Sequence, residues 1–295
     1  MFHRLLITTD FEDGLHRLVN FIPELALAGF QKIVFLHCVP LREGSIPQVD
    51  EKKQAQAQAK LAPALQDIPE GVQVQVELLS SLSKASTAQT ILDAVQQHQS
   101  DLVITGMPTH NLLDEKLFVS TTSKLAQKIT VPLLILRPQL VSAYTVEELS
   151  LRCQHLFRYL LVPYDGSSSA EYVIQFIQAK MQNQMCQEMM TCLLCWVLEK
   201  TKLQKLGSQS QLADCQQTLE AVKKRIARSD LQVEIEVREG TAIAEIQAVA
   251  LESDTTVIVV SSKHFGRLWE LAIPSFAGEI LRRSWHPILF LPPVR

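Results

Sequence analysis

The chain has 295 residues, of which 47 % are apolar, so its length allows about two ordinary domains with cores of their own. Its 28 lysines and arginines against 31 acidic residues leave a formal net charge of −3, which excludes a dedicated nucleic-acid binder because such proteins carry a basic excess. The longest apolar run, 192–198, is far shorter than the roughly 20 residues of a membrane-spanning helix, and the N-terminus lacks a signal-peptide pattern. We therefore expect a cytoplasmic protein without nucleic-acid or membrane partners.

Apolar strands and helical stretches alternate through the first half of the chain. The predicted strands of this half are 4–9, 32–40, 72–79, 101–106 and 131–137, and the predicted helices are 13–29, 48–66, 84–98 and 120–129. Four of these strands are continuous Val/Ile/Leu runs, which are typical of parallel strands buried on both faces. The alternation favours an α/β fold with a doubly wound, five-stranded parallel sheet.

The second half of the sequence repeats this order. The acid that follows the first strand is Asp10 in one half and Asp165 in the other, and the same spacing of 155 residues relates Ser120 to Ser275. The predicted strands here are 157–164, 189–198, 231–238, 255–261 and 286–291, and the predicted helices are 167–183, 208–229, 242–253 and 275–284. This internal duplication predicts two homologous tandem domains, 1–139 and 157–295.

The linker 140–156 is expected to contain a short helix. Thr145 and Glu148 have the spacing of a capping box, which satisfies backbone N–H groups at a helix start. The fifth strand of each half would otherwise be an exposed sheet edge. We expect these two edges to pair, so that the halves form a pseudo-twofold dimer.

The six cysteines follow no disulfide framework. Cys192 and Cys195 form a C-x-x-C within an apolar strand, where residues three apart point to opposite faces of the sheet. A redox motif requires a strand-to-helix turn, and a zinc site requires a second ligand pair. We predict that both are buried thiols.

In an open α/β sheet, ligands bind beyond the carboxyl ends of the strands. Asp10 and Asp165 both follow the first strand of their half. Each could accept hydrogen bonds from a ribose or a base amino group. Each could equally be a turn acid or a helix cap, and the residues alone leave both alternatives open.

The loop after the fourth strand has the same spacing in both halves. Its corresponding positions are Gly106, Thr109, Val119 and Ser120 in the first half, and Ser261, His264, Pro274 and Ser275 in the second. Together with the acid that closes the first strand, this spacing resembles the Gly-x-x-Gly, nine residues, Gly-Ser/Thr signature with which the universal stress protein family binds ATP. The run 238–243 is similar to the family's Gly-x-x-x-x-Ile stretch.

The resemblance implies a tandem universal stress protein, whose partners would be a second copy of itself, in a homodimer, and another protein. It also implies which residues would contact ATP or another adenine nucleotide. These are Asp10, Val39, Gly106, Thr109, Ser120 and Thr121 in the first half, and Asp165, Gly166, Val197, Ser261, His264 and Ser275 in the second.

The glycine positions of the signature are mostly replaced. Val119 and His264 add bulk where a phosphate would approach the backbone, and Pro274 has no N–H to donate. We therefore expect weak or absent ATP binding in a stress-response regulatory or protective module without metal or catalytic residues. One alternative is an interaction scaffold without nucleotide binding. Another is a weak ATPase that uses Asp114 or Glu115.

Overall fold

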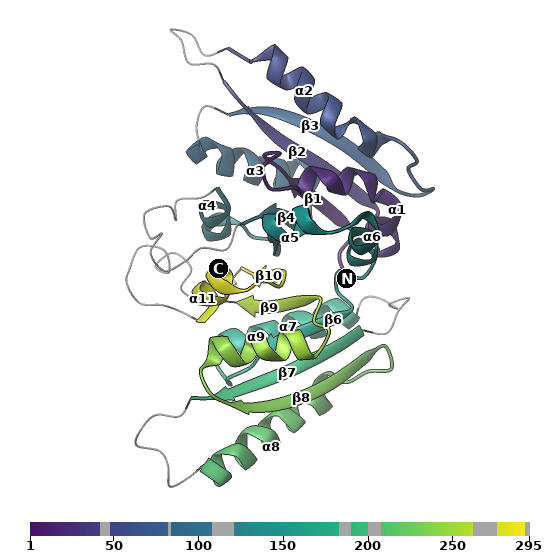
Figure 1. Ribbon diagram of the computed structural model, residues 1–295. Coiled ribbons are helices and arrows are strands. Elements are labelled where there is room, and N and C mark those ends of the chain that lie inside the picture. The colour runs from purple at the N-terminus through teal and green to yellow at the C-terminus, as the bar shows by residue number, and fades with distance from the viewer. Residues whose placement is uncertain are drawn as a thin grey trace.

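The computed structural model describes residues 1–41, 48–81, 84–107, 121–182, 190–199, 208–261 and 276–292. The strands of this part form one sheet in the order β3-β2-β1-β4-β5-β10-β9-β6-β7-β8 (Figure 1). They are β1 Arg4–Thr8, β2 Lys32–Pro40, β3 Gln73–Ser81, β4 Leu102–Gly106, β5 Leu133–Leu136, β6 Tyr159–Pro163, β7 Met190–Leu198, β8 Leu231–Glu239, β9 Val257–Ser261 and β10 Ile288–Leu291. Each predicted strand is therefore present, within two residues at either end.

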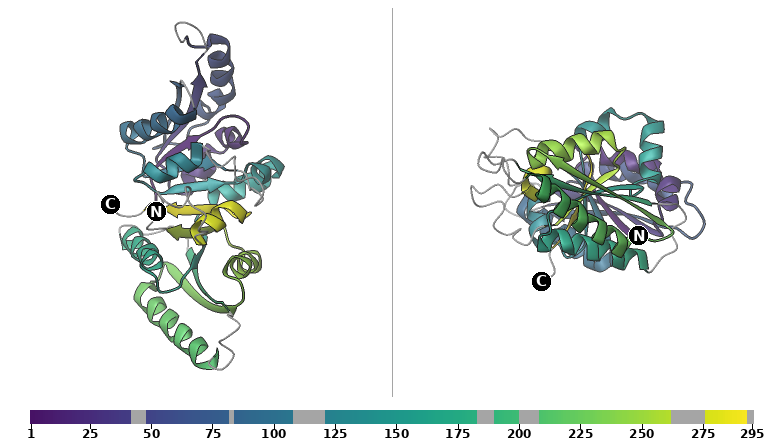
Figure 2. Two further views of the ribbon diagram at one scale, coloured as in Figure 1. Left: turned by 90° about the vertical axis from the view of Figure 1, so that its left-hand side faces the viewer. Right: turned by 90° about the horizontal axis from the view of Figure 1, so that it is seen from below.

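Helices cover both faces of the sheet, as predicted for a doubly wound fold (Figure 2). The first half has η1 Leu15–Asn20, α1 Ile22–Leu27, α2 Glu51–Leu61, η2 Ala62–Leu65, α3 Lys84–His98 and α4 Thr121–Lys128. The linker has α5 Pro138–Ala143 and α6 Val146–Gln154, and the second half has α7 Ser168–Gln182, α8 Ser208–Ile226, α9 Ala242–Glu252 and α11 Phe276–Arg283.

The fifth strands of the two halves pair in the middle of the sheet. Within each half the neighbouring strands are parallel, whereas β5 and β10 are antiparallel, with Leu134 opposite Leu289. The predicted edge pairing is confirmed. Its consequence is one continuous ten-stranded sheet rather than two separate sheets, with β3 and β8 at the outer edges.

Two cores lie on the two faces of this sheet. Helices η1, α1, α2, α7 and α8 pack on one face together with the linker helices, and α3, α4, α9 and α11 pack on the other. Alternate residues of β1 point to opposite cores: Leu5 and Ile7 belong to the first, and Leu6 to the second. Because the strand is buried on both faces, its sequence is apolar throughout rather than alternating.

The predicted helix 13–29 is wrong in detail. The segment folds as the short 3-10 helix η1 followed by α1, and Phe21 between them leaves the helical region with φ −124° and ψ 32°. Pro23 lies in the first turn of α1, where its missing N–H costs nothing. A proline in the middle of one long helix would instead remove a backbone hydrogen bond.

The linker contains two helices rather than the single one expected. The capping box is confirmed at the start of α6, where the Thr145 hydroxyl accepts from the Glu148 N–H at 3.3 Å. The Glu148 carboxylate accepts from the Thr145 N–H at 2.8 Å in return. Leu149 is buried and Leu156 packs against the same core, so the linker closes the first face of the sheet.

Arg137, directly after β5, is buried where the two halves meet. Its Nη1 donates to the Met107 carbonyl at 3.0 Å, and its Nη2 donates to the carbonyls of Leu281 at 2.8 Å and Ile280 at 3.4 Å. These last two belong to the carboxyl-terminal turn of α11, whose dipole favours a cation. Burial lowers the pKa of Arg137 to about 10, so it is still charged at neutral pH.

Cys192 and Cys195 belong to opposite cores, as predicted from the period of a strand. Burial raises the pKa of each thiol to about 12. A thiolate is the reactive form of cysteine, so neither residue is suited to redox chemistry near neutral pH. In the described part of the chain, no helix has the length and apolarity needed to span a membrane.

Candidate functional site

A cavity of about 580 Å³ lies at the carboxyl ends of the strands in the second half, where α/β sheets commonly bind ligands. Its walls come from the carboxyl ends of β6, β7 and β9, from the residues directly after β6 and β7, and from helices α7, α9 and α11. We call it the second-half cleft. The residues lining it are Pro163, Tyr164, Asp165, Ser167, Ser169, Ala170, Val173, Cys195, Val197, Glu199, Thr241, Ala242, Ile243, Ile246, Val260, Ser261, Phe276, Ala277 and Glu279.

The turn after β6 brings Asp165 to the cleft. Its carboxylate accepts a hydrogen bond from the Ser167 N–H at 2.9 Å, while the side chain remains exposed. Gly166 is left-handed, with φ 72°, and a Cβ there would lie 3.3 Å from the indole of Trp196. Asp165 therefore acts as a turn acid, and its exposed carboxylate can also contact a ligand.

The lining of the second-half cleft is acidic. Asp165, Glu199 and Glu279 all line it, and none of the described lining residues is a lysine or arginine. Like charges repel most strongly where water is partly excluded. A polyphosphate in the described part of the cleft would thus lie near these carboxylates, of which that of Glu279 is 3.8 Å from the Arg283 guanidinium.

One wall of the cleft is apolar. Val197, Ile243 and Ile246 line it beside Val260. A small number of polar groups set into an apolar wall is the common composition of small-molecule sites. Among the hydroxyl groups that line the cleft, that of Ser261 already donates a hydrogen bond to the Leu291 carbonyl at 2.9 Å.

In the first half, the corresponding turn folds back on its own strand ends. The Asp10 carboxylate accepts from the N–H groups of Glu12 at 2.9 Å and Asp13 at 3.0 Å. Asp13 in turn lies against Gly106, where an added Cβ would be 2.7 Å from the Asp13 Cβ. The family signature would assign this glycine to contact with a phosphate. Here a glycine is needed because a Cβ at this position would collide with the Asp13 side chain.

Asp13 is held by short hydrogen bonds. Its Oδ1 accepts from the Thr9 hydroxyl at 2.7 Å and from the Leu15 N–H at 2.9 Å. Burial, together with the charge of Asp10, raises the pKa of Asp13 to about 6. At neutral pH this half therefore carries a partly buried negative charge beside Gly106.

An aromatic cluster lies over the same turn. The Phe11 ring stacks on His37 with centroids 4.3 Å apart, and the Lys60 ammonium lies 4.6 Å from its centre. His37 Nδ1 donates to the Thr9 carbonyl at 2.8 Å. Val39 at the end of β2 is fully buried. The two halves thus share their fold but differ at their strand ends.

A family model described as "Universal stress protein family" matches residues 1–137 and 157–292. The chain belongs to the universal stress protein family. No curated protein sequence is detectably similar to it. It is therefore a tandem member with one family domain in each half.

Solved structures reproduce this tandem fold. A universal stress protein from Archaeoglobus fulgidus DSM 4304 is 16 % identical, with a TM-score of 0.64 over 98 % of this chain and 96 % of that chain. A functionally unknown protein from Pseudomonas aeruginosa PAO1 is 17 % identical, with a TM-score of 0.57 over 99 % of this chain and 93 % of that chain. At these identities the likeness concerns the fold alone.

The residues expected at the nucleotide are only partly brought together. Asp165, Val197 and Ser261 line one cleft, and Gly166 supports the turn that carries Asp165. Asp10 and Gly106 are engaged by their own loop in the first half. Thr121 begins α4, but its neighbour Thr122 is the residue that bonds the Gly106 carbonyl, at 2.9 Å. Four expected residues lie outside the described part: Thr109, Ser120, His264 and Ser275.

Several residues that line the second-half cleft were not predicted from the sequence. Glu199 lies two residues beyond Val197, and Thr241 lies directly before α9. Both follow the carboxyl end of a predicted strand, which is a signal that could have identified them. Glu279 lies within a helix, and only the packing of α11 against the cleft reveals it. Among the described residues, no cluster of three or more His, Cys, Asp or Glu side chains could hold a metal ion.

Proposed function

We propose that the chain is a stress-response regulatory module of the universal stress protein family that binds the nucleoside part of an adenine nucleotide in the second-half cleft. The observation that carries this proposal is the cleft of about 580 Å³ at the family's expected site, with Asp165 at its edge. Hydroxyls can donate hydrogen bonds to a ribose or an adenine or accept them, and a carboxylate can accept them. The apolar wall can pack against the base.

The same cleft disfavours the phosphates. The carboxylates of Asp165, Glu199 and Glu279 would face the phosphates, and the described residues that line the cleft supply no cation; Arg283, 3.8 Å from Glu279, lies outside this lining. At the glycine position that ends β9, Ser261 directs its hydroxyl to the Leu291 carbonyl. We expect adenosine and AMP to bind more tightly than ATP.

The experiment is thermal unfolding with adenosine, AMP or Mg-ATP, followed by calorimetric titration. A ligand present at a hundred times its dissociation constant adds about 2.7 kcal/mol of stability, which is readily measured. Ala242→Phe should abolish the stabilisation, because Ala242 lines the cleft. Ala244→Phe is the matched control, because Ala244 is exposed on the same helix. Equal effects of the two variants, or no shift with any ligand, would contradict the proposal.

The charge argument has its own test. Replacing Glu199 and Glu279 by glutamine should strengthen the binding of ATP relative to adenosine, because the repulsion falls while the cavity keeps its shape. The control is Glu51→Gln together with Glu70→Gln, two exposed positions outside the cleft. An unchanged ratio of the two affinities would refute the electrostatic part of the proposal.

A second candidate is an interaction scaffold that binds no nucleotide. The first half favours it, since Asp13 occupies the space beside Gly106 and places a carboxylate there. Absence of a thermal shift with all three ligands, and of a co-purified nucleotide by mass spectrometry, would select this candidate. A shift that survives Asp10→Ala but not Ala242→Phe would instead place binding in the second half alone.

A further inference from the structure

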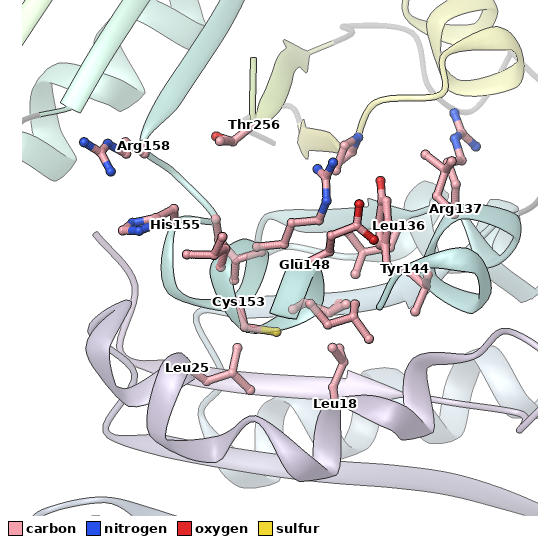
Figure 3. A pocket seen from close by; sticks show the side chains of 18 of the residues that line it. Leu18, Leu25, Leu136, Arg137, Tyr144, Glu148, Cys153, His155, Arg158 and Thr256 are labelled. Carbon is pink, nitrogen blue, oxygen red and sulfur yellow. The ribbon is translucent and has the colours of Figure 1, made fainter. Parts of the chain in front are cut away.

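A second cavity, of about 440 Å³, lies at the centre of the sheet and away from both strand-end sites. We call it the linker cavity. Figure 3 shows Leu18 and Leu25 approaching it from η1 and α1, and Cys153 on the linker helix α6. Thr256 and Arg158 come from the second half on the opposite side. Three parts of the chain therefore meet around it.

The topology accounts for the linker cavity. On this face of the sheet, η1, α1 and α2 cover the outer strands of the first half, and α7 and α8 cover those of the second. Helix α7 also packs on β9, whereas the linker helices lie on the same face as the remaining central strands β4, β5 and β10. Because the chain has a single linker, its helices close the first-half side, and the space toward Thr256 and Pro287 is left open.

The interior and the mouth of the linker cavity are apolar. Leu18, Leu136 and Leu149 line its interior. At the mouth, Leu151 is 59 % exposed and Trp285 is 53 % exposed. Exposed apolar side chains beside a cavity are the composition that a binding surface has.

Cationic groups line the same cavity. Arg137, Arg152 and Arg158 all belong to its wall, and no described carboxylate lies within 4.0 Å of any of them. Arg152 stacks on the Tyr144 ring at 4.2 Å, and Arg158 lies 5.6 Å from the Tyr159 ring centre. These two guanidinium groups thus rest on aromatic faces.

Arg137 adds a buried donor. Only 1 % of its surface is exposed, and its Nε has no hydrogen-bond partner among the described residues. A buried N–H without a partner is costly, and a ligand oxygen or water would relieve it. Of the two acids that line the cavity, Glu148 is already engaged in the capping box with Thr145. The other, Asp254, forms no ion pair with the three arginines.

We propose that the linker cavity binds an amphipathic anion, namely a medium-length acyl chain that ends in a carboxylate. The chain would occupy the leucine-lined interior, and the carboxylate would pair with Arg152 and Arg158 at the rim. A volume of about 440 Å³ is within the range of small-molecule sites. This proposal is independent of the second-half cleft, since the two cavities share no lining residue.

The test is calorimetric titration of the full chain with dodecanoate, below its micellar concentration, and with dodecylamine at the same concentrations. We expect saturable binding of one dodecanoate per chain, and binding of dodecylamine weaker by about tenfold or more, because the rim is cationic. Equal affinity for the two amphiphiles, or the absence of saturable dodecanoate binding, would overturn the proposal.

Matched double variants locate the site. Arg152→Gln with Arg158→Gln should weaken dodecanoate binding by about tenfold. Lys52→Gln with Lys53→Gln removes the same charge from exposed positions on α2 and should leave it unchanged. All four side chains are exposed, so the variants are expected to fold. An equal loss in both pairs would indicate a non-specific charge effect and refute the assignment.

A second pair of variants tests the mouth. Leu151→Glu places a negative charge at the entrance and should weaken dodecanoate binding, whereas Leu251→Glu changes an equally apolar residue that is 75 % exposed on α9 and does not line the cavity. Binding that is unaffected by Leu151→Glu would count against this location.

Discussion

Phe11 and Gly166 occupy equivalent positions in the two halves and share the same left-handed backbone, with φ of 69° and 72°. The residue after the strand-ending acid therefore has a similar φ in both domains, although only one of them has the residue that this conformation favours. In the first half, the Phe11 ring gains contacts with His37 and Lys60 that offset the strain. In the second half, Gly166 leaves the turn open beside the cleft.

Gly166→Ala should lower the free energy of unfolding by roughly 1–2 kcal/mol, because a Cβ disfavours the left-handed region. The new methyl group would also lie 3.3 Å from the Trp196 ring. Chemical denaturation measures the change. Gly166→Asn is the matched variant and should cost less, since asparagine tolerates this conformation. Equal losses from alanine and asparagine would show that steric crowding, rather than backbone strain, determines the effect.

The raised pKa of Asp13 makes the stability of the first half depend on pH. Since the carboxyl is protonated more readily in the folded state, its favourable contribution is complete below pH 3.8 and is lost as the pH rises through about 6. Asp13→Asn keeps a carbonyl oxygen that can accept from Thr9 and Leu15. We expect it to stabilise the protein by up to about 3 kcal/mol above that range, and to have little effect near pH 4.

Urea denaturation at several pH values tests this expectation. Asp93→Asn is the control, because Asp93 is exposed on α3. If Asp13→Asn destabilised the protein equally at low and neutral pH, the carboxylate would be a favourable hydrogen-bond acceptor rather than a buried charge.

Arg137→Met should destabilise the protein on the order of 3 kcal/mol, because it leaves buried carbonyls of Met107 and Leu281 without their donor. Since those carbonyls belong to different halves, the loss should also broaden the unfolding transition or split it in two. Arg283→Met removes an exposed guanidinium from α11, the helix that contains Leu281, and should lower the free energy of unfolding by less than about 0.5 kcal/mol. A similar effect of both variants would show that Arg137 does not link the halves.

Cys192 and Cys195 should resist alkylation in the native protein and react only after unfolding, because burial holds both as thiols with a pKa of about 12. Peptide mapping after treatment with iodoacetamide, with and without urea, distinguishes the two states. The melting temperature should also be the same with and without reducing agent. Rapid native labelling of either residue would contradict its placement in a core.

The sequence predicted the elements and their order well because hydrophobic runs determine which strands are buried on both faces. The pairing of β5 with β10 was equally predictable, since an unpaired apolar edge is unfavourable. The burial of Arg137 was not, because its partners Met107 and Leu281 are distant in sequence and only tertiary packing brings their carbonyls together. The position of Asp13 against Gly106 could not be predicted for a similar reason. An acid three residues after Asp10 is equally typical of a solvent-exposed turn.

The antiparallel pairing of β5 with β10 makes the chain the covalent equivalent of a two-subunit assembly. In an assembly of identical subunits, every substitution appears twice, so a carboxylate like that of Asp13 would alter both sites at once. A single polypeptide that encodes each partner separately is free of this constraint. The first half can fill the space at its strand ends with its own side chains while the second half keeps a cleft there. Because both halves are translated as one polypeptide, their ratio is always one to one.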